Sequence, residues 1–107
     1  MLLGTGFEDT EAIAPLDLMR RAGIEVKTVG INGKVVYGGH GIGIEADISP
    51  EEMDLDRMEM IVLPGGLGGV ASIRASEAAT ACGFGDYSAF YRAYLKRYGM
   101  TPSGNIR

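Results

Sequence analysis

The side chains that could do chemistry here are few, because the chain has one cysteine, Cys82, and one histidine, His40. A lone cysteine excludes an internal disulfide and offers no CxxC or Cys/His cluster, so we expect no metal and no other cofactor. As a thiolate, Cys82 would be a nucleophile, whereas a buried thiol would pack as a small apolar side chain. His40 lies in a glycine-rich stretch that predicts a turn as the alternative to a catalytic role.

An apolar run closed by Pro64-Gly65-Gly66 predicts a buried strand that ends in a turn, the usual place for a site in an open α/β sheet. Strand and helix patterns alternate before it. Asp9 or Thr10 is expected to cap a helix that carries Pro15 and Arg21 and stops at Gly23. The other expected elements are strands at Met1–Leu3, Ile24–Ile31, Lys34–Tyr37, Gly41–Ala46 and Met60–Leu63, an Asn32-Gly33 hairpin turn, and a short acidic helix over Pro50–Leu55.

This order of elements predicts an α/β fold with a partly parallel sheet and the first helix over one face. A chain of 107 residues is expected to form one small domain. No apolar run approaches the ~20 residues that span a bilayer, and no signal peptide is recognisable. We therefore expect a soluble, cytoplasmic protein without a membrane partner. The glycine-rich stretches contain no GxGxxG or Gly-Lys-Ser/Thr motif, so nucleotide binding is not predicted.

The chain changes character after Gly66. Up to Ser72 it has five Lys and Arg against twelve Asp and Glu, a net charge of −7, and from Ile73 onward five against two, a net charge of +3. Leu67-Gly68-Gly69 is expected to be a flexible joint. Helices are predicted over Ser76–Cys82 and Asp86–Tyr98, and the glycine-containing bend between them makes a helix-turn-helix candidate.

Four motifs of the acidic region occur in the order of a known family. They are Gly6-Phe7-Glu8-Asp9-Thr10-Glu11, Pro15-Leu16-Asp17-Leu18-Met19-Arg20-Arg21-Ala22-Gly23, His40-Gly41-Ile42 and Val62-Leu63-Pro64-Gly65-Gly66. On these motifs, residues 1–73 resemble the ThiJ/PfpI superfamily, the family of the parkinsonism-associated deglycase and chaperone proteins. The resemblance implies a flavodoxin-like sandwich, here truncated, whose members are commonly dimers.

The same resemblance implies a reactive cysteine on a sharp strand-to-helix turn, beside a protonated glutamate that Glu11 matches. A neutral carboxylic acid can hydrogen-bond and stabilise a thiolate. The family's cysteine and histidine come later than this chain reaches, and Cys82 follows Gly66 too closely to take that position. Glu11 is therefore either half of a catalytic pair or a first-turn acid that the helix dipole favours.

Residues 78–103 resemble the second helix-turn-helix of AraC-type transcription regulators. That resemblance places Cys82 in the small core of the motif and the start of the recognition helix near Tyr87. The alternative is that these helices only cover a bare sheet face. If the motif binds DNA, the residues facing the groove or the phosphates are Tyr87, Ser88, Tyr91, Arg92, Lys96 and Arg97.

The chain is thus expected to join two parts, residues 1–73 and residues 74–107, and three hypotheses follow for its function. The leading one is a DNA-binding, transcription-regulator-like protein with a non-catalytic ThiJ/PfpI-like part. The second is a ThiJ/PfpI-type hydrolase or deglycase acting on reactive carbonyls, with Glu11 and Cys82 as candidate catalytic residues. The third is a truncated or chimeric fragment without selected activity. Because truncation exposes strand edges and apolar surface, we also expect self-association or repacking of the tail helices onto the sheet.

Overall fold

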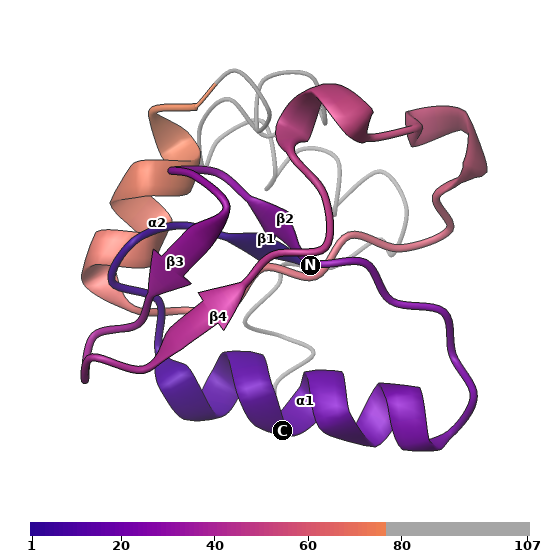
Figure 1. The fold of residues 1–107 in the computed structure, drawn as a ribbon, viewed down its shortest axis with the longest axis horizontal. Helices are drawn as coiled ribbons and strands as arrows, with labels where there is room; N and C mark the ends of the chain where they lie inside the picture. Colours follow the sequence, from indigo (N-terminus) through magenta and orange to yellow (C-terminus); the bar gives the residue numbers. More distant parts are fainter. Residues whose placement is uncertain (77–107) are drawn as a thin grey trace, which may run out of the picture. The chain divides into compact units, whose positions relative to one another are not determined.

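The computed structural model describes residues 1–76. The chain divides into two units, Met1–Ile73 and Arg74–Arg107. Its elements appear in Figure 1 in the order β1 (Leu2–Leu3), α1 (Asp9–Arg21), β2 (Val29–Gly30), β3 (Val35–Tyr37), β4 (Gly43–Glu45), two 3₁₀ turns (Pro50–Glu52 and Leu55–Arg57) and α2 (Leu67–Arg74).

The strands β1 and β2 form a parallel pair, in which Leu2 aligns with Val29 and Leu3 with Gly30. An isolated parallel bridge between Val29 and Ile48 extends this pair. On the other side of β1, the N–H of Leu2 donates to the carbonyl of Val62 at 3.0 Å. The segment Met60–Leu63 therefore lies beside β1, but the prediction of a buried strand there is wrong: the segment forms no regular ladder, and Met60 is 75% and Leu63 40% exposed. Parallel pairing with a helical crossover gives the α/β fold that the sequence predicts.

The predicted hairpin through Asn32-Gly33 is wrong. The strand β2 pairs with β1, and β3 pairs antiparallel with β4, so the hairpin turn is the glycine-rich stretch that contains His40. Figure 1 shows β3 and β4 side by side, joined by this turn. Asn32 instead accepts the N–H of Thr5 with its side-chain oxygen at 2.7 Å. An Asn-Gly pair is a local turn signal, and it does not decide which strand a neighbouring segment pairs with.

The helix α1 forms where the capping and stop signals predict it, and Figure 1 shows it along one side of the strands. Its N-cap is Glu8, one residue earlier than expected, because the Glu8 carboxylate accepts the N–H of Glu11 at 2.7 Å. Pro15 lies inside the helix, and Gly23 follows it with a φ of +81°.

Two local predictions are wrong in type. The expected acidic helix forms two 3₁₀ turns, the first of which has Ser49 as its N-cap residue. The expected flexible joint Leu67-Gly68-Gly69 is the first turn of α2. Gly69 is buried there and lies so close to Phe7 that a Cβ on it would be 2.7 Å from the Phe7 Cα. Close packing against the backbone of Phe7 therefore holds this glycine-rich segment in a helix.

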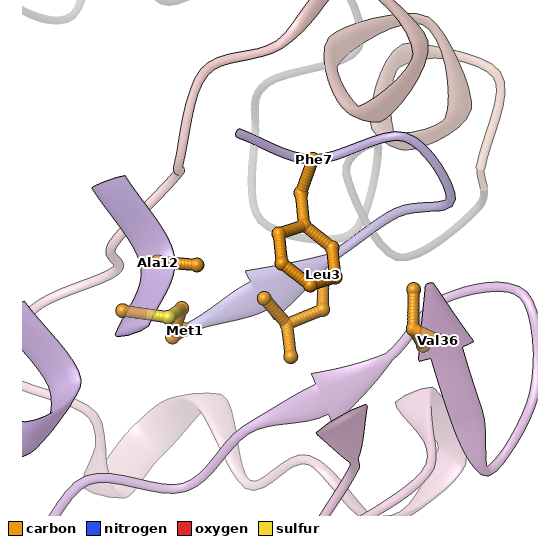
Figure 2. Packing of buried hydrophobic residues seen from close by; sticks show 5 residues of the cluster. All are labelled: Met1, Leu3, Phe7, Ala12 and Val36. Atoms are coloured by element: carbon orange, nitrogen blue, oxygen red, sulfur yellow. The ribbon is translucent and has the colours of Figure 1, made fainter. Parts of the chain in front are cut away.

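The core lies between α1 and the strands. Figure 2 shows the Phe7 ring over Leu3, with Met1 and Ala12 on one side and Val36 on the other. Each of these side chains is at most 7% exposed. Around them pack the partly buried side chains of Leu16, Met19, Val26, Ile44 and Val62.

Both predicted tail helices and the helix-turn-helix lie outside the described residues, apart from Ser76 at the start of the first helix. Within the part of the chain that the structure describes, no helix has the length and apolar character to cross a membrane.

Candidate functional site

Glu11 lies in the first turn of α1, where its side chain contacts the Pro64-Gly65-Gly66 turn. The N–H of Gly65 donates to Glu11 Oε2 at 2.8 Å, across 54 residues of sequence. Among the described residues, Glu11 Oε1 has no hydrogen-bond partner. Glu11 is an exposed residue. The arrangement fixes one end of the carboxyl group and leaves the other end free to exchange a hydrogen bond or a proton.

The turn is held against the residues that precede α1. The N–H of Glu8 donates to the Gly65 carbonyl at 2.9 Å, so Gly65 is bonded through both its N–H and its C=O. Gly66 has a φ of +96°, and a Cβ on it would lie 2.6 Å from the Gly6 oxygen and 2.7 Å from the Glu8 nitrogen. Only glycine fits this backbone conformation and this close approach. The Pro-Gly-Gly motif thus serves to place an amide against Glu11.

The stretch with His40 contacts the same residues from the β3–β4 side. The N–H of Gly39 donates to the Phe7 carbonyl and that of Gly6 to the Tyr37 carbonyl, both at 2.8 Å. The N–H of His40 donates to Asp9 Oδ2 at 3.2 Å. The imidazole is 82% exposed, with Nδ1 3.5 Å from the same oxygen. These contacts make His40 an anchoring residue of the hairpin turn.

A separate polar cluster joins the end of α1 to the strands. Asp47 Oδ2 accepts the N–H of Thr28 at 2.9 Å, its hydroxyl at 3.0 Å and Arg20 Nη2 at 2.6 Å. The backbone N–H of Thr28 does most to hold the pKa of Asp47 below 3.8, with partial burial opposing it and the Arg20 guanidinium helping it. This cluster ties elements together.

A cavity of about 560 Å³ lies beside this cluster, lined by residues 30, 31, 33, 34 and 46–52. Glu11 and Asp9 are not among its lining residues. Within residues 1–76, no group of three or more His, Cys, Asp or Glu side chains could hold a metal ion.

Of the predicted catalytic residues, the structure places Glu11 at the Gly65 amide. Cys82 and the six predicted DNA-contacting residues lie outside the described residues, so their roles stay predictions. The interpretation from sequence missed Gly65 as a donor and Asp9 as a buried anchor. The positions of Gly65 after an apolar run and of Asp9 at a helix start are local signals, but their partners are 54 and 31 residues away.

The fold and the glutamate in the first turn of α1, bonded to the Pro64-Gly65-Gly66 turn, define a flavodoxin-like α/β protein with an acidic candidate site. The model of the DJ-1/PfpI family matches residues 1–96. The chain therefore belongs to the DJ-1/PfpI family. The matched range passes Ile73 and overlaps the region where a helix-turn-helix is predicted.

Two relatives illustrate the similarity in sequence. The chain is 40% identical over 70 residues to Protein dj-1beta of Drosophila melanogaster, a match covering 64% of this chain and 37% of the relative. It is 36% identical over 66 residues to a deglycase of Thermococcus kodakarensis, covering 62% of this chain and 40% of the relative. The chain thus spans less than half the length of these relatives.

Solved structures show the same similarity. The crystal structure of Drosophila melanogaster DJ-1beta matches with a TM-score of 0.70 at 31% identity, over 89% of this chain and 47% of that chain. A mutant of a DJ-1 superfamily protein from Salmonella typhimurium matches with a TM-score of 0.68 at 38% identity, over 75% of this chain and 44% of that chain.

Proposed function

We propose that this chain provides the glutamate side of a carbonyl-processing site, of the kind found in the deglycases to which it is similar. The observation that supports the proposal is the Glu11 carboxyl of an exposed residue, whose Oε2 accepts the Gly65 N–H at 2.8 Å while its Oε1 has no hydrogen-bond partner among the described residues. Relatives named deglycases favour this function over a DNA-binding regulator. Because the chain spans under half of their length, their complete activity is part of the proposal.

The proposed reaction needs two groups that act on a reactive carbonyl compound. A nucleophile adds to the carbonyl carbon, and an acid hydrogen-bonds to or protonates the carbonyl oxygen as negative charge develops there. Glu11 Oε1 is positioned for the second task. Cys82 is the one thiol of the chain and the candidate for the first.

Turnover of methylglyoxal by the full chain tests the proposal. We expect measurable turnover that falls on the order of 10²-fold or more in Glu11→Gln, the range of general acid–base contributions. The matched control is Glu51→Gln, an exposed glutamate of the first 3₁₀ turn, which should leave turnover unchanged. Turnover that survives Cys82→Ser assigns the nucleophile to another group, and no turnover by the wild type refutes the enzymatic function.

A second candidate is DNA binding by residues 74–107. It is motivated by the positive charge after Ile73 and by the predicted helix-turn-helix. Fluorescence anisotropy with labelled duplex DNA at low salt should then show binding that weakens in Arg92→Ala. Binding that is absent, or unchanged in this variant, would reject it.

Self-association is proposed as well, because large apolar side chains are exposed on the described unit. Met60 is 75% and Leu18 64% exposed. Light scattering should report a species larger than the 11.3 kDa chain. A monodisperse monomer would contradict the proposal.

A further inference from the structure

Asp9 is a buried carboxylate for which the proposed reaction has no use. The residue is 6% exposed, although it sits at the first position of a surface helix. Its Oδ2 accepts the His40 N–H at 3.2 Å, while its Oδ1 is buried and has no hydrogen-bond partner among the described residues. A buried carboxylate oxygen without a partner is costly, so the surrounding structure must require it.

The close packing of the Asp9 carboxylate is seen at Gly38. A Cβ on Gly38 would overlap Asp9 Oδ1, which means that the Gly38 backbone lies directly against the carboxylate. The carboxylate therefore sits inside the β3–β4 turn, residues 38–41. It holds this turn by one hydrogen bond to His40 and by direct packing on Gly38.

The turn in its place holds the backbone just before α1. The Gly39 N–H of the turn donates to the Phe7 carbonyl. The Gly6 N–H donates to the carbonyl of Tyr37, the last residue of β3. The opposite edge of the same short segment meets the Pro-Gly-Gly turn through the bond from the Glu8 N–H to the Gly65 carbonyl. Residues 6–9 are thus fixed from two sides, and Glu11 follows within one helical turn.

We propose that Asp9 is a positioning residue. By locking the β3–β4 turn onto residues 6–9, it keeps the start of α1 at the distance from which Glu11 reaches the Gly65 N–H. The proposal rests on the proposed function only in taking Glu11 as the reacting group. The positioning itself is a property of the folded chain that can be measured without a substrate.

The Gly65 amide proton is the reporter, because it is bonded to the carboxylate that Asp9 is proposed to position. In full-length protein, we expect Asp9→Ala to move this NMR signal and to speed its hydrogen exchange by roughly tenfold, as the bond to Glu11 loosens. Asp9→Asn keeps an acceptor oxygen for the His40 N–H and should restore most of the signal. Asp47→Ala, which removes a carboxylate from the other polar cluster, should leave the Gly65 signal in place.

A different result overturns the proposal. If Asp9→Ala frees the amides of residues 38–41 while Gly65 exchanges as in the wild type, the turn does not position Glu11. If Asp9→Ala fails to fold, Gly38→Ala loosens the same contact from the other side and should move the Gly65 signal equally. An unchanged signal in folded Gly38→Ala likewise refutes the proposal.

Kinetics separate this proposal from the proposed function. With turnover present, Asp9→Ala should lower kcat with little change in KM, because the reacting carboxyl is displaced while the substrate still binds. An increase in KM alone contradicts positioning. With no turnover in any variant, the proposed function fails, and the Gly65 amide alone decides the role of Asp9.

Discussion

Replacing Gly66 by alanine should disrupt the turn that holds Glu11, and its cost can be worked out from the structure. A φ of +96° costs an L-residue about 1–2 kcal/mol. The new Cβ would approach the Gly6 oxygen to 2.6 Å and the Glu8 nitrogen to 2.7 Å, so the turn must move. The movement breaks two hydrogen bonds of Gly65, each contributing about 1 kcal/mol. The total is about 3–4 kcal/mol.

Gly23→Ala is the matched control. Gly23 has a φ of +81°, but nothing lies within 4 Å of the position that its Cβ would take. It should therefore cost only about 1 kcal/mol, since the strain is partly offset by the lower entropy of the unfolded alanine chain. The difference between the two variants, about 2–3 kcal/mol, isolates the contact between the Pro-Gly-Gly turn and the residues before α1.

Urea unfolding of both variants measures this difference as a change in midpoint at constant slope. Equal midpoints would refute the reasoning, because the close approach of Gly66 to residues 6–8 would then carry no cost. A lower slope in Gly66→Ala alone would mean that the variant is less compact when folded, and hydrogen exchange at Gly65 would locate the change.

Three further outcomes are expected. Phe7→Ala, at a fully buried ring, should cost about 3–5 kcal/mol in the same assay. Glu8→Ala removes the cap on the Glu11 N–H and should cost about 1 kcal/mol, measured by thermal unfolding. The lowered pKa of Asp47 adds stability above pH 3.8 that is lost as the pH falls through the folded-state pKa, so Asp47→Asn should flatten the acid limb of the stability curve. Solvent screening of the one-third exposed Asp47 keeps that effect below about 1 kcal/mol.

The helix α1 shows how far local signals reach. Its acidic first turn, its basic last turn and the following Gly23 all lie within 16 residues, and the helix occupies nearly the predicted range. Capping and periodicity act between residues at most four apart, so a sequence pattern contains them in full. The order of strand and helix patterns predicted the α/β fold, and the family motifs singled out Glu11.

The errors in strand pairing and at the start of α2 concern long-range contacts. The Asn32-Gly33 signal predicted a hairpin between β2 and β3. The strand β2 instead pairs with β1, in which Leu2 aligns with Val29, 27 residues away. The glycines at the start of α2 looked like a joint until their packing on Phe7 was visible. In both cases the residue types allow more than one backbone conformation. Contacts with residues distant in the sequence determine which of these conformations forms.

The sequence alone therefore determined the helix α1, the places of β1, β3 and β4, the family and the glutamate on which the proposed chemistry depends. Only the tertiary structure decided that β2 pairs with β1, that the Gly65 amide meets the Glu11 carboxyl and that Asp9 is buried in the β3–β4 turn. The physical reason is the separation along the chain. Contacts between residues 27 to 54 positions apart form only when the free energy of packing the whole unit exceeds the entropy lost in closing those loops.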